Sequence, residues 1–214
     1  MSFSVAGQEV VVVGGARSGV AAAELLHERG AHVTLTDSRA DSFEGADRLR
    51  ALGVTVELGP HRESLLLDAD LVVLSPGVPP DQPVLQTARR AGVPIIGEIE
   101  LASRWLSGRV VAITGTKGKS TTTTLTARML EAGGLTVTAG GNLGTPLSTQ
   151  VAASTAAAIH VVEVSSFQLE TTDRFHPWIA VLVNLSPDHL DRHATFAEYA
   201  GAKARIFANQ TPED

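Results

Sequence analysis

Residues 112–121 carry the strongest chemical signal in the sequence, the run A-I-T-G-T-K-G-K-S-T. Its two glycines allow the backbone to curl so that N–H groups face an anion. Lys119 can reach the outer phosphates of a nucleotide as a point charge, and the Ser120 hydroxyl can ligate Mg²⁺. The strict G-x-x-x-x-G-K-[ST] pattern is not met, because Ile113 stands where its first glycine belongs. We predict a phosphate-binding loop; the alternative is a glycine-rich turn that only joins a strand to a helix.

Two further polar clusters follow apolar runs in the second half of the chain. Glu163 lies near the end of the apolar run 157–164. A carboxylate is costly to bury unpaired, and beside a phosphate loop its natural partner is Mg²⁺, which prefers oxygen ligands. The alternative is a carboxylate that caps the next helix or pairs with a lysine. Residues 184–193, rich in Asp, His and Arg, suggest a site as well, although solvated loops can have this composition.

The first half contains a degraded dinucleotide-binding pattern. Residues 14–19, G-G-A-R-S-G, follow four valines and precede a helical pattern. Asp37 ends the next strand pattern, where such folds hold a ribose hydroxyl. Ala16 occupies the position of the second glycine, and its Cβ would crowd a pyrophosphate, so a turn needing glycine only for packing is the alternative. The turn at residues 75–77 follows another strand pattern, at an edge where ligands bind in open α/β sheets.

These groups must be positioned by two sets of parallel strands. Apolar runs predict strands at residues 8–13, 32–36, 54–58, 71–74 and 93–96, and then at 110–113, 135–138, 157–164 and 179–183. Loops that follow parallel strands meet along one edge, so the polar loops of the second set should converge. The predicted fold class is α/β, with a Rossmann-like parallel-sheet domain over residues 1–97 and a P-loop-type ATPase domain over residues 98–214.

Composition narrows the functional classes. The chain has 214 residues, 43% of them hydrophobic and 19% charged, which is typical of a globular protein. A net charge of −6 argues against a general nucleic-acid or membrane-surface binder. There is no cysteine, so disulfides and thiolate metal sites are excluded. No apolar run approaches the length of a membrane span. We expect a cytoplasmic monomer.

Five separated motifs resemble the Mur ligase family, the ATP-dependent amide-forming enzymes of peptidoglycan-precursor synthesis. They are T-G-T-K-G-K-S-T, G-G-N-L-G-T-P, E-V-S-S-F-Q-L-E, N-L-S-P-D-H-L-D-R-H and the helix with Ala202-Lys203. The S-S-F-Q-L-E run, together with the nucleotide-type first half, is most similar to the D-glutamate-adding branch. The resemblance implies ATP, D-glutamate and UDP-N-acetylmuramoyl-L-alanine as substrates, with an acyl phosphate as intermediate.

The resemblance also implies a role for each matched residue. The ATP loop would consist of Gly115, Thr116, Lys117, Gly118, Lys119, Ser120 and Thr121. The UDP-bearing substrate would contact Arg17, Ser18, Asp37, Ser38, Arg39, Ser75, Pro76, Gly77, Asn142 and His189. Mg²⁺ would occupy two sites, one with Ser120 and Glu163 and one with His189 and Lys203, a lysine that the family carbamylates. The catalytic set would be Lys119, Glu163, His189 and Lys203. Lys117 departs from the asparagine expected at its position.

Other interpretations remain open. Family members carry a third domain that supplies much of the D-glutamate site, and this chain ends at Asp214, so we expect precursor binding without turnover. A different ligase of the superfamily is possible, such as the L-alanine-adding Mur ligase or folylpolyglutamate synthase, but the latter has no first domain of this kind. An NAD(P)-binding domain fused to a P-loop module would bind NADH and no uridine nucleotide. A non-catalytic module that senses the precursor is the third alternative.

Overall fold

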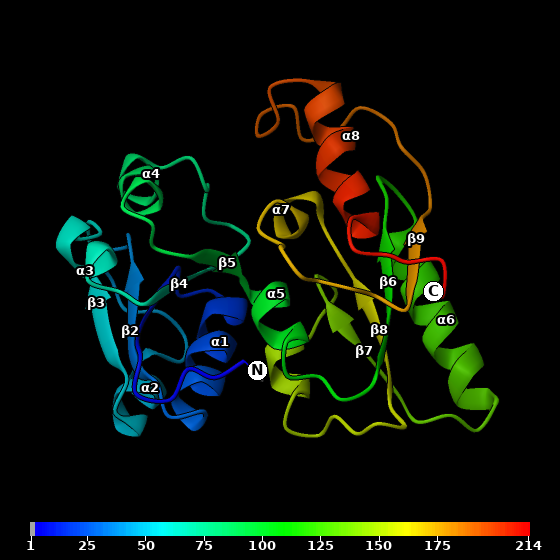
Figure 1. The fold of residues 1–214 in the computed structure, drawn as a ribbon, viewed down its shortest axis with the longest axis horizontal. Helices are drawn as coiled ribbons and strands as arrows, with labels where there is room; N and C mark the ends of the chain where they lie inside the picture. Colours follow the sequence, from blue (N-terminus) through cyan, green and yellow to red (C-terminus); the bar gives the residue numbers. More distant parts are fainter. Residues whose placement is uncertain (1–2) are drawn as a thin grey trace. The chain divides into compact units, whose positions relative to one another are not determined.

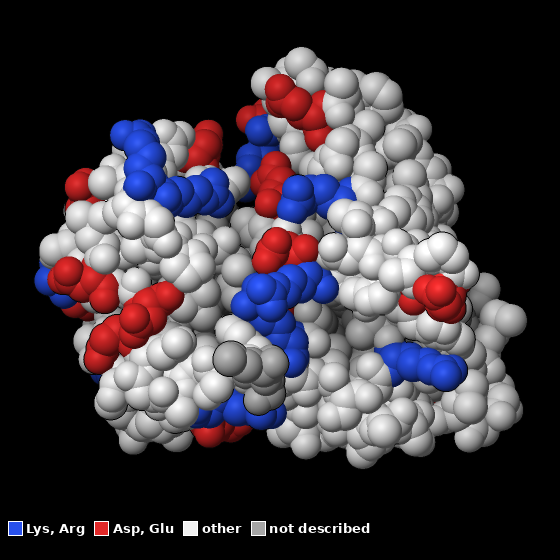
Figure 2. All heavy atoms as spheres, viewed as in Figure 1, with Lys and Arg blue, Asp and Glu red and all other residues white. Residues whose placement is uncertain are grey.

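A computed structural model gives the structure of residues 3–214, which form two compact units, one ending at Ala102 and one running from Ser103 to Asp214 (Figure 1). The division lies one short helix, α5 (Glu98–Ser103), beyond residue 97. Both units are α/β with parallel sheets, so the predicted fold class is confirmed. Among residues 3–214 no helix is both long and apolar enough to cross a membrane. Basic and acidic side chains are interspersed on the face drawn in Figure 2.

The first unit is a five-stranded sheet in the order β3-β2-β1-β4-β5. Its strands are β1 (Glu9–Val13), β2 (His32–Asp37), β3 (Thr55–Leu58), β4 (Leu71–Leu74) and β5 (Ile95–Gly97), and its helices are α1 (Arg17–Glu28), α2 (Ala46–Leu52), α3 (Glu63–Leu67) and α4 (Pro83–Arg90). The valines of β1 are buried on both faces of the sheet. Val11 and Val13 pack with Leu66 of α3 and Leu85 of α4. Because β1 pairs with both β2 and β4, the loop after β1 lies between the loops that follow those strands.

The second unit also contains a parallel sheet, with four strands in the order β7-β8-β6-β9. The strands are β6 (Arg109–Thr114), β7 (Val137–Gly141), β8 (Ile159–Glu163) and β9 (Ile179–Leu182). The helices are α6 (Lys119–Ala132), α7 (Ser166–Leu169) and α8 (Phe196–Ala204), with 3₁₀ turns η1 (Leu147–Gln150) and η2 (Arg205–Phe207). Since β6 pairs with β8 on one side and β9 on the other, its following loop lies between Glu163, the last residue of β8, and residues 184–193.

Leu125, Met129 and Ala132 recur at helical spacing, which predicts a helix here, but in α6 all three lie on the exposed side. Leu125 is 57% exposed and Met129 is 66% exposed. The residues that α6 buries are Thr123 and Ala127, the latter in a cluster with core residues of β6 and β8. The periodicity therefore predicts the helix but not the face that packs on the sheet, because small residues make that contact.

A buried histidine holds the second unit together at the start of its strands. His160 of β8 is fully buried, with Nδ1 at 2.8 Å from the Thr138 hydroxyl and Nε2 at 2.8 Å from the Ser154 hydroxyl. Ser154 in turn accepts the N–H groups of Ser107 and Gly108 at 3.0 and 3.3 Å. Thr138 donates to Gln150 at 2.6 Å. The Thr138 hydroxyl can then only accept from Nδ1–H. Ser154 already accepts two N–H groups, so its hydroxyl donates to Nε2, and the network requires a neutral imidazole.

This network predicts a loss of stability in mild acid. Burial lowers the pKa of His160 below its usual value near 6.5. The unfolded chain therefore binds the proton first, and the free energy of unfolding falls as pH drops below about 6.5 towards the folded pKa. His61 and His193 are also shifted downwards and act in the same direction. We expect thermal midpoints between pH 7 and pH 5 to fall more steeply for the wild-type chain than for His160→Gln. Equal slopes would contradict the role given to His160.

Candidate functional site

The predicted phosphate loop is the turn between β6 and α6. Gly118, the N-cap of α6, has a φ of 78°, a left-handed conformation that favours glycine. The first N–H groups of the helix have no helical partner, and the helix dipole adds partial positive charge there. The Lys119 ammonium donates to the Thr116 carbonyl at 3.0 Å, which keeps it beside the turn. Lys117, Gly118, Ser120 and Thr121 are exposed. The turn can therefore present N–H groups and a cation to an anion.

Contacts from the loop after β9 hold the turn in this shape. The Asn184 side chain accepts the Lys117 N–H at 3.0 Å and donates to the Lys117 carbonyl at 2.9 Å. The Thr116 hydroxyl donates to the Ser186 carbonyl at 3.1 Å and accepts from the Ser186 N–H at 3.0 Å. It also accepts from the Tyr199 hydroxyl at 3.1 Å. The loop is therefore stabilised before any ligand binds, which lowers the entropic cost of binding.

Glu163 contacts the phosphate loop directly. It is 2% exposed at the end of β8, and its Oε2 accepts from the Ser120 hydroxyl at 2.6 Å. Its Oε1 accepts from the Asn142 amide at 2.8 Å. The alternative of helix capping does not describe this residue, because Ser165 caps α7. A buried carboxylate is thus held beside the serine that was predicted to share a metal with it.

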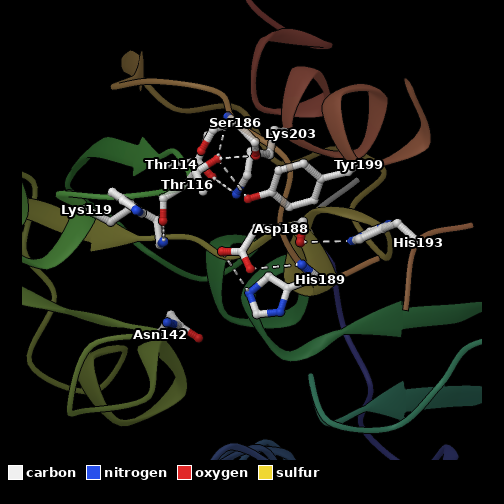
Figure 3. Close-up of polar contacts among 12 residues, drawn as sticks. Thr114, Thr116, Lys119, Asn142, Ser186, Asp188, His189, His193, Tyr199 and Lys203 are labelled. Carbon is white, nitrogen blue, oxygen red and sulfur yellow. Dashed lines mark hydrogen bonds and ion pairs between the residues drawn. The ribbon is translucent and has the colours of Figure 1, made fainter. Parts of the chain in front are cut away.

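Lys203 is buried at the same edge of the sheet (Figure 3). It is 2% exposed, and its Nζ lies 3.5 Å from the Thr114 hydroxyl and 4.7 Å from the centroid of the Tyr199 ring. Burial lowers its pKa to about 8, and the Lys119 charge acts in the same direction, whereas Asp188 and Glu163 oppose the shift. A single lysine between two alanines on a helix suggests a surface residue, but Lys203 is buried. With a pKa of about 8, a fraction of its amine is neutral near neutral pH.

The two predicted metal sets differ in how well they fit Mg²⁺. Within residues 3–214, no three His, Asp or Glu side chains lie close enough to hold a metal ion by themselves. Ser120 and Glu163 nevertheless fit Mg²⁺, because this ion retains waters and takes one or two carboxylates together with substrate phosphates. Lys203 offers only N–H donors while it is charged. The second set, His189 and Lys203, therefore does not fit Mg²⁺ without modification of the lysine.

In the first unit, the Asp37 side chain is hydrogen-bonded to the loop after β1. Its carboxylate accepts the Gly15 N–H at 2.5 Å and three N–H groups of Arg39 at 2.8 to 2.9 Å. Hydrogen bonds from the Arg39 side chain are the main cause that lowers the Asp37 pKa to about 2, against the effect of burial. A carboxylate has about four acceptor positions. Asp37 therefore has no free position for a ribose hydroxyl, and it orients Arg39, which is 53% exposed.

On its other side, the same loop contacts Ser75, which directly follows β4, and the aromatic ring of Phe43. The Ser75 hydroxyl donates to the Gly14 carbonyl at 2.9 Å. A Cβ on Gly15 would lie 2.6 Å from the Phe43 ring, and one on Gly19 would lie 1.8 Å from the Gly14 carbonyl oxygen. These two glycines are therefore required for packing within the unit. Arg17, Ser18, Ser38, Pro76 and Gly77 stand around this loop edge, with Arg17, Ser38, Arg39 and Gly77 exposed.

Two family descriptions match the chain, in the order of the two units. A "Mur ligase MurD-like, N-terminal domain" matches residues 8–97, and a "Mur ligase middle domain" matches residues 113–214. The chain belongs to the Mur ligase family. The predicted resemblance is confirmed at this level.

Curated Mur ligases match almost the whole of this chain. UDP-N-acetylmuramoylalanine--D-glutamate ligase of Koribacter versatilis is 49% identical over 99% of this chain and 47% of its own length. The ligase of the same name from Anaeromyxobacter dehalogenans is 53% identical over 97% of this chain and 45% of its own length. The chain thus spans about half the length of the curated relatives that it matches.

Solved Mur ligase structures share the fold. UDP-N-acetylmuramate-alanine ligase MurC of Thermotoga maritima has a TM-score of 0.57 at 25% identity, covering 94% of this chain and 47% of the other. A UDP-N-acetylmuramate:L-alanyl-gamma-D-glutamyl-meso-diaminopimelate ligase from Neisseria meningitides has a TM-score of 0.61 at 22% identity, covering 96% of this chain and 69% of the other. The latter similarity concerns the fold alone.

The structure gathers the residues that the Mur ligase motifs predicted for the second unit. Residues 115–121, Asn142, Glu163 and Lys203 lie at one edge of the sheet, linked by the contacts above. His189 is exposed beside Asp188, whose Oδ1 accepts its N–H at 2.9 Å. Sequence reasoning did not single out Tyr199 and Asn184, which shape the loop. An asparagine directly after the apolar run 179–183 was the signal available for Asn184.

Proposed function

We propose that this chain is the substrate- and ATP-binding part of an ATP-dependent ligase that joins D-glutamate to UDP-N-acetylmuramoyl-L-alanine. The observation that carries the proposal is the contact between buried Glu163 and Ser120 of the phosphate loop, beside Lys119. In this proposal, the first unit binds the uridine diphosphate sugar and the second binds ATP. We also propose a cytoplasmic location, where ATP is available to the enzyme. The names of the relatives support the choice of D-glutamate as the amine.

The chemistry follows from charge and position. The substrate carboxylate attacks the γ-phosphorus of ATP, and an acyl phosphate and ADP form. Lys119 and the N–H groups of the loop neutralise charge that develops on the transferred phosphoryl group. Mg²⁺ bound at Ser120 and Glu163 would supply further charge neutralisation on the phosphate oxygens. The D-glutamate amine then attacks the acyl carbon, phosphate leaves, and an amide bond forms. Positioning and electrostatics would account for the rate, without a covalent enzyme intermediate.

Lys203 fits a carbamylated role within this proposal. A neutral amine can attack CO₂ and yield a carbamate anion and a proton, which converts a donor into an oxygen ligand suited to a hard cation. Its burial and its lowered pKa both favour the neutral amine. A signal from ¹³CO₂-derived carbamate that is absent in Lys203→Ala would support this role, and its absence from the wild-type chain would count against it.

The first unit favours a uridine nucleotide over NAD(P). Asp37 already accepts four hydrogen bonds, so it cannot hold a ribose diol in the way that dinucleotide-binding folds do. The Phe43 ring occupies space beside the loop, because it lies 2.6 Å from where a Cβ on residue 15 would stand. Arg39 instead offers an exposed guanidinium, oriented by Asp37, at the carboxyl end of β2.

Asp37→Asn tests this arrangement. Each carboxylate oxygen of Asp37 accepts two hydrogen bonds, and the amide nitrogen that replaces one oxygen can only donate, so two of the four bonds are lost and the guanidinium loses its fixed orientation. We expect the affinity for UDP, measured by calorimetry, to fall about tenfold, in line with the cost of a charge-assisted hydrogen bond. Asp41→Asn is the control, since Asp41 is exposed on the following loop. Unchanged UDP affinity in a folded Asp37→Asn chain would contradict the proposed site.

The activity is tested in a chain extended to the length of the curated relatives, called the full-length enzyme below. Hydroxylamine should trap an acyl phosphate as a hydroxamate when ATP and UDP-N-acetylmuramoyl-L-alanine are present. Addition of D-glutamate should replace hydroxamate with amide product and release one phosphate for each ATP used. Phosphate release that does not depend on the uridylated substrate would contradict the proposal, and incorporation of L-alanine instead of D-glutamate would favour another Mur ligase.

A further inference from the structure

The loop that carries His189 is closed into a turn. The His189 carbonyl accepts the N–H groups of Arg192 at 3.0 Å and His193 at 2.9 Å. His189 has a φ of 51°, and no other non-glycine residue among residues 3–214 has a positive φ. Such a backbone conformation costs free energy and persists only where the surroundings hold it. The position of His189 therefore depends on what anchors the other end of the turn, His193.

His193 is anchored by two polar contacts on helix α7. Its side chain is 3% exposed, with Nδ1 at 3.3 Å from Glu170 Oε1 and Nε2 at 3.0 Å from the Ser166 hydroxyl. A carboxylate only accepts hydrogen bonds, so its position beside Nδ1 favours a hydrogen on that nitrogen. Burial lowers the pKa of His193, which favours the neutral ring, and its Nε2 then accepts from Ser166. Arg192 Nη2 holds the other Glu170 oxygen at 3.2 Å. The contacts thus specify one tautomer of His193.

An aromatic ring joins the anchor to His189. The Phe167 ring lies 5.6 Å from the His193 ring, nearly parallel to it, and 5.1 Å from the His189 ring. The Arg192 guanidinium lies 5.0 Å from the same Phe167 ring. Phe167 belongs to α7, which follows β8 and Glu163 by only a few residues. The His189 side chain therefore rests on the element that also follows the buried carboxylate.

We propose that His193, held as the Nδ1–H tautomer between Glu170 and Ser166, is a positioning residue that fixes His189 against Phe167. The contacts from Ser166 to His193 and from His193 to Glu170 resemble those of a catalytic triad, in which a base contacts a serine nucleophile and an acid orients the base. Ser166 and His193 are only 2% and 3% exposed, so substrate cannot reach the hydroxyl, and the arrangement serves position. The position of His189 in the ligand-free protein does not depend on the proposed function, and only the consequence for metal binding rests on it.

The tautomer and the ring contact can be measured in this chain without any ligand. In ¹⁵N-detected imidazole spectra, we expect a protonated Nδ1 and an unprotonated Nε2 for His193, together with a Phe167–His189 nuclear Overhauser contact. His193→Ala should remove this contact, and His193→Asn, which keeps a donor towards Glu170, should restore part of it. An Nε2–H tautomer, or an intact Phe167–His189 contact in His193→Ala, would overturn the proposal.

His160→Ala provides the matched control, because His160 is an equally buried histidine in the same unit with two hydroxyl partners. It should lower stability yet leave the Phe167–His189 contact unchanged. If it abolishes that contact as His193→Ala does, the effect is general loosening and the proposal fails. A fluorophosphonate probe should leave Ser166 unlabelled, whereas labelling would show a nucleophilic serine and overturn the positioning role.

The consequence for the metal is measured separately. In the presence of ATP and of bicarbonate, the source of CO₂ for a carbamate on Lys203, His193→Ala should weaken Mn²⁺ binding at the set that includes His189 about tenfold, as is usual for a residue that orients a ligand. Electron paramagnetic resonance measures this binding. Wild-type affinity in that variant would contradict the inference. If the wild-type chain binds no Mn²⁺, the proposed function fails instead. The positioning role of His193 is then still tested by its tautomer and by the Phe167–His189 contact.

Discussion

The Lys119→Ala full-length enzyme is expected to form acyl phosphate about 10² to 10³ times more slowly than wild type, the usual cost of removing one preorganised stabilising group. The ammonium lies beside the loop, bonded to the Thr116 carbonyl at 3.0 Å, and replaces that contact with phosphate when ATP binds in our proposal. Because its charge acts mainly in the transition state, kcat should fall more than the affinity for ATP. Rapid-quench measurement of hydroxamate and phosphate checks this expectation.

Lys117→Ala is the matched control, two residues earlier in the same loop. Its side chain is exposed, and Asn184 holds its backbone rather than its side chain. We expect its rate to stay within a few-fold of wild type. Wild-type rates in Lys119→Ala, or equal losses in the two variants, would show that the loop does not use Lys119 as proposed.

Glu163→Gln should produce the second large effect. The side chain keeps its shape but loses its charge, and its amide nitrogen faces either the Ser120 hydroxyl or the Asn142 amide, which are 2.6 and 2.8 Å from the carboxylate oxygens. We expect the Mg²⁺ concentration that gives half of the maximal rate to rise at least about tenfold, with a loss of about a hundredfold in kcat. Rates at varied Mg²⁺ and saturating ATP measure both.

Glu198→Gln serves as the control for Glu163→Gln. Its carboxylate is exposed and accepts the Ala194 N–H at the start of α8. This variant should keep the Mg²⁺ dependence of wild type. An unchanged Mg²⁺ dependence in Glu163→Gln would remove Glu163 from the proposed metal site, whatever its effect on kcat.

The sequence predicted the parallel α/β fold because each strand is a short apolar run that ends in a polar loop. Strand ends were harder to predict. β7 was expected at residues 135–138 and runs from Val137 to Gly141, because pairing with β8 continues through two glycines that propensity disfavours. The buried face of α6 was missed for the related reason that Thr123 and Ala127, rather than its leucine and methionine, pack on the sheet.

The residues that the structure brings together could be predicted where one local motif holds them. The phosphate loop, Glu163 and Asn142 follow strands that become neighbours, so convergence could be argued from the chain alone. Tyr199 and His193 could not be found in this way, because their roles depend on contacts with Thr116 and Glu170 that are remote in sequence. The burial of Lys203 likewise depends on how α8 packs, which a single lysine between alanines does not reveal.

Calorimetry of this chain with UDP-N-acetylmuramoyl-L-alanine tests the central claim most directly, with NADH as the competing ligand and Asp37→Asn as the control variant. The account predicts saturable binding of the uridylated precursor that Asp37→Asn weakens, and no binding of NADH. Saturable NADH binding without binding of the precursor would contradict it.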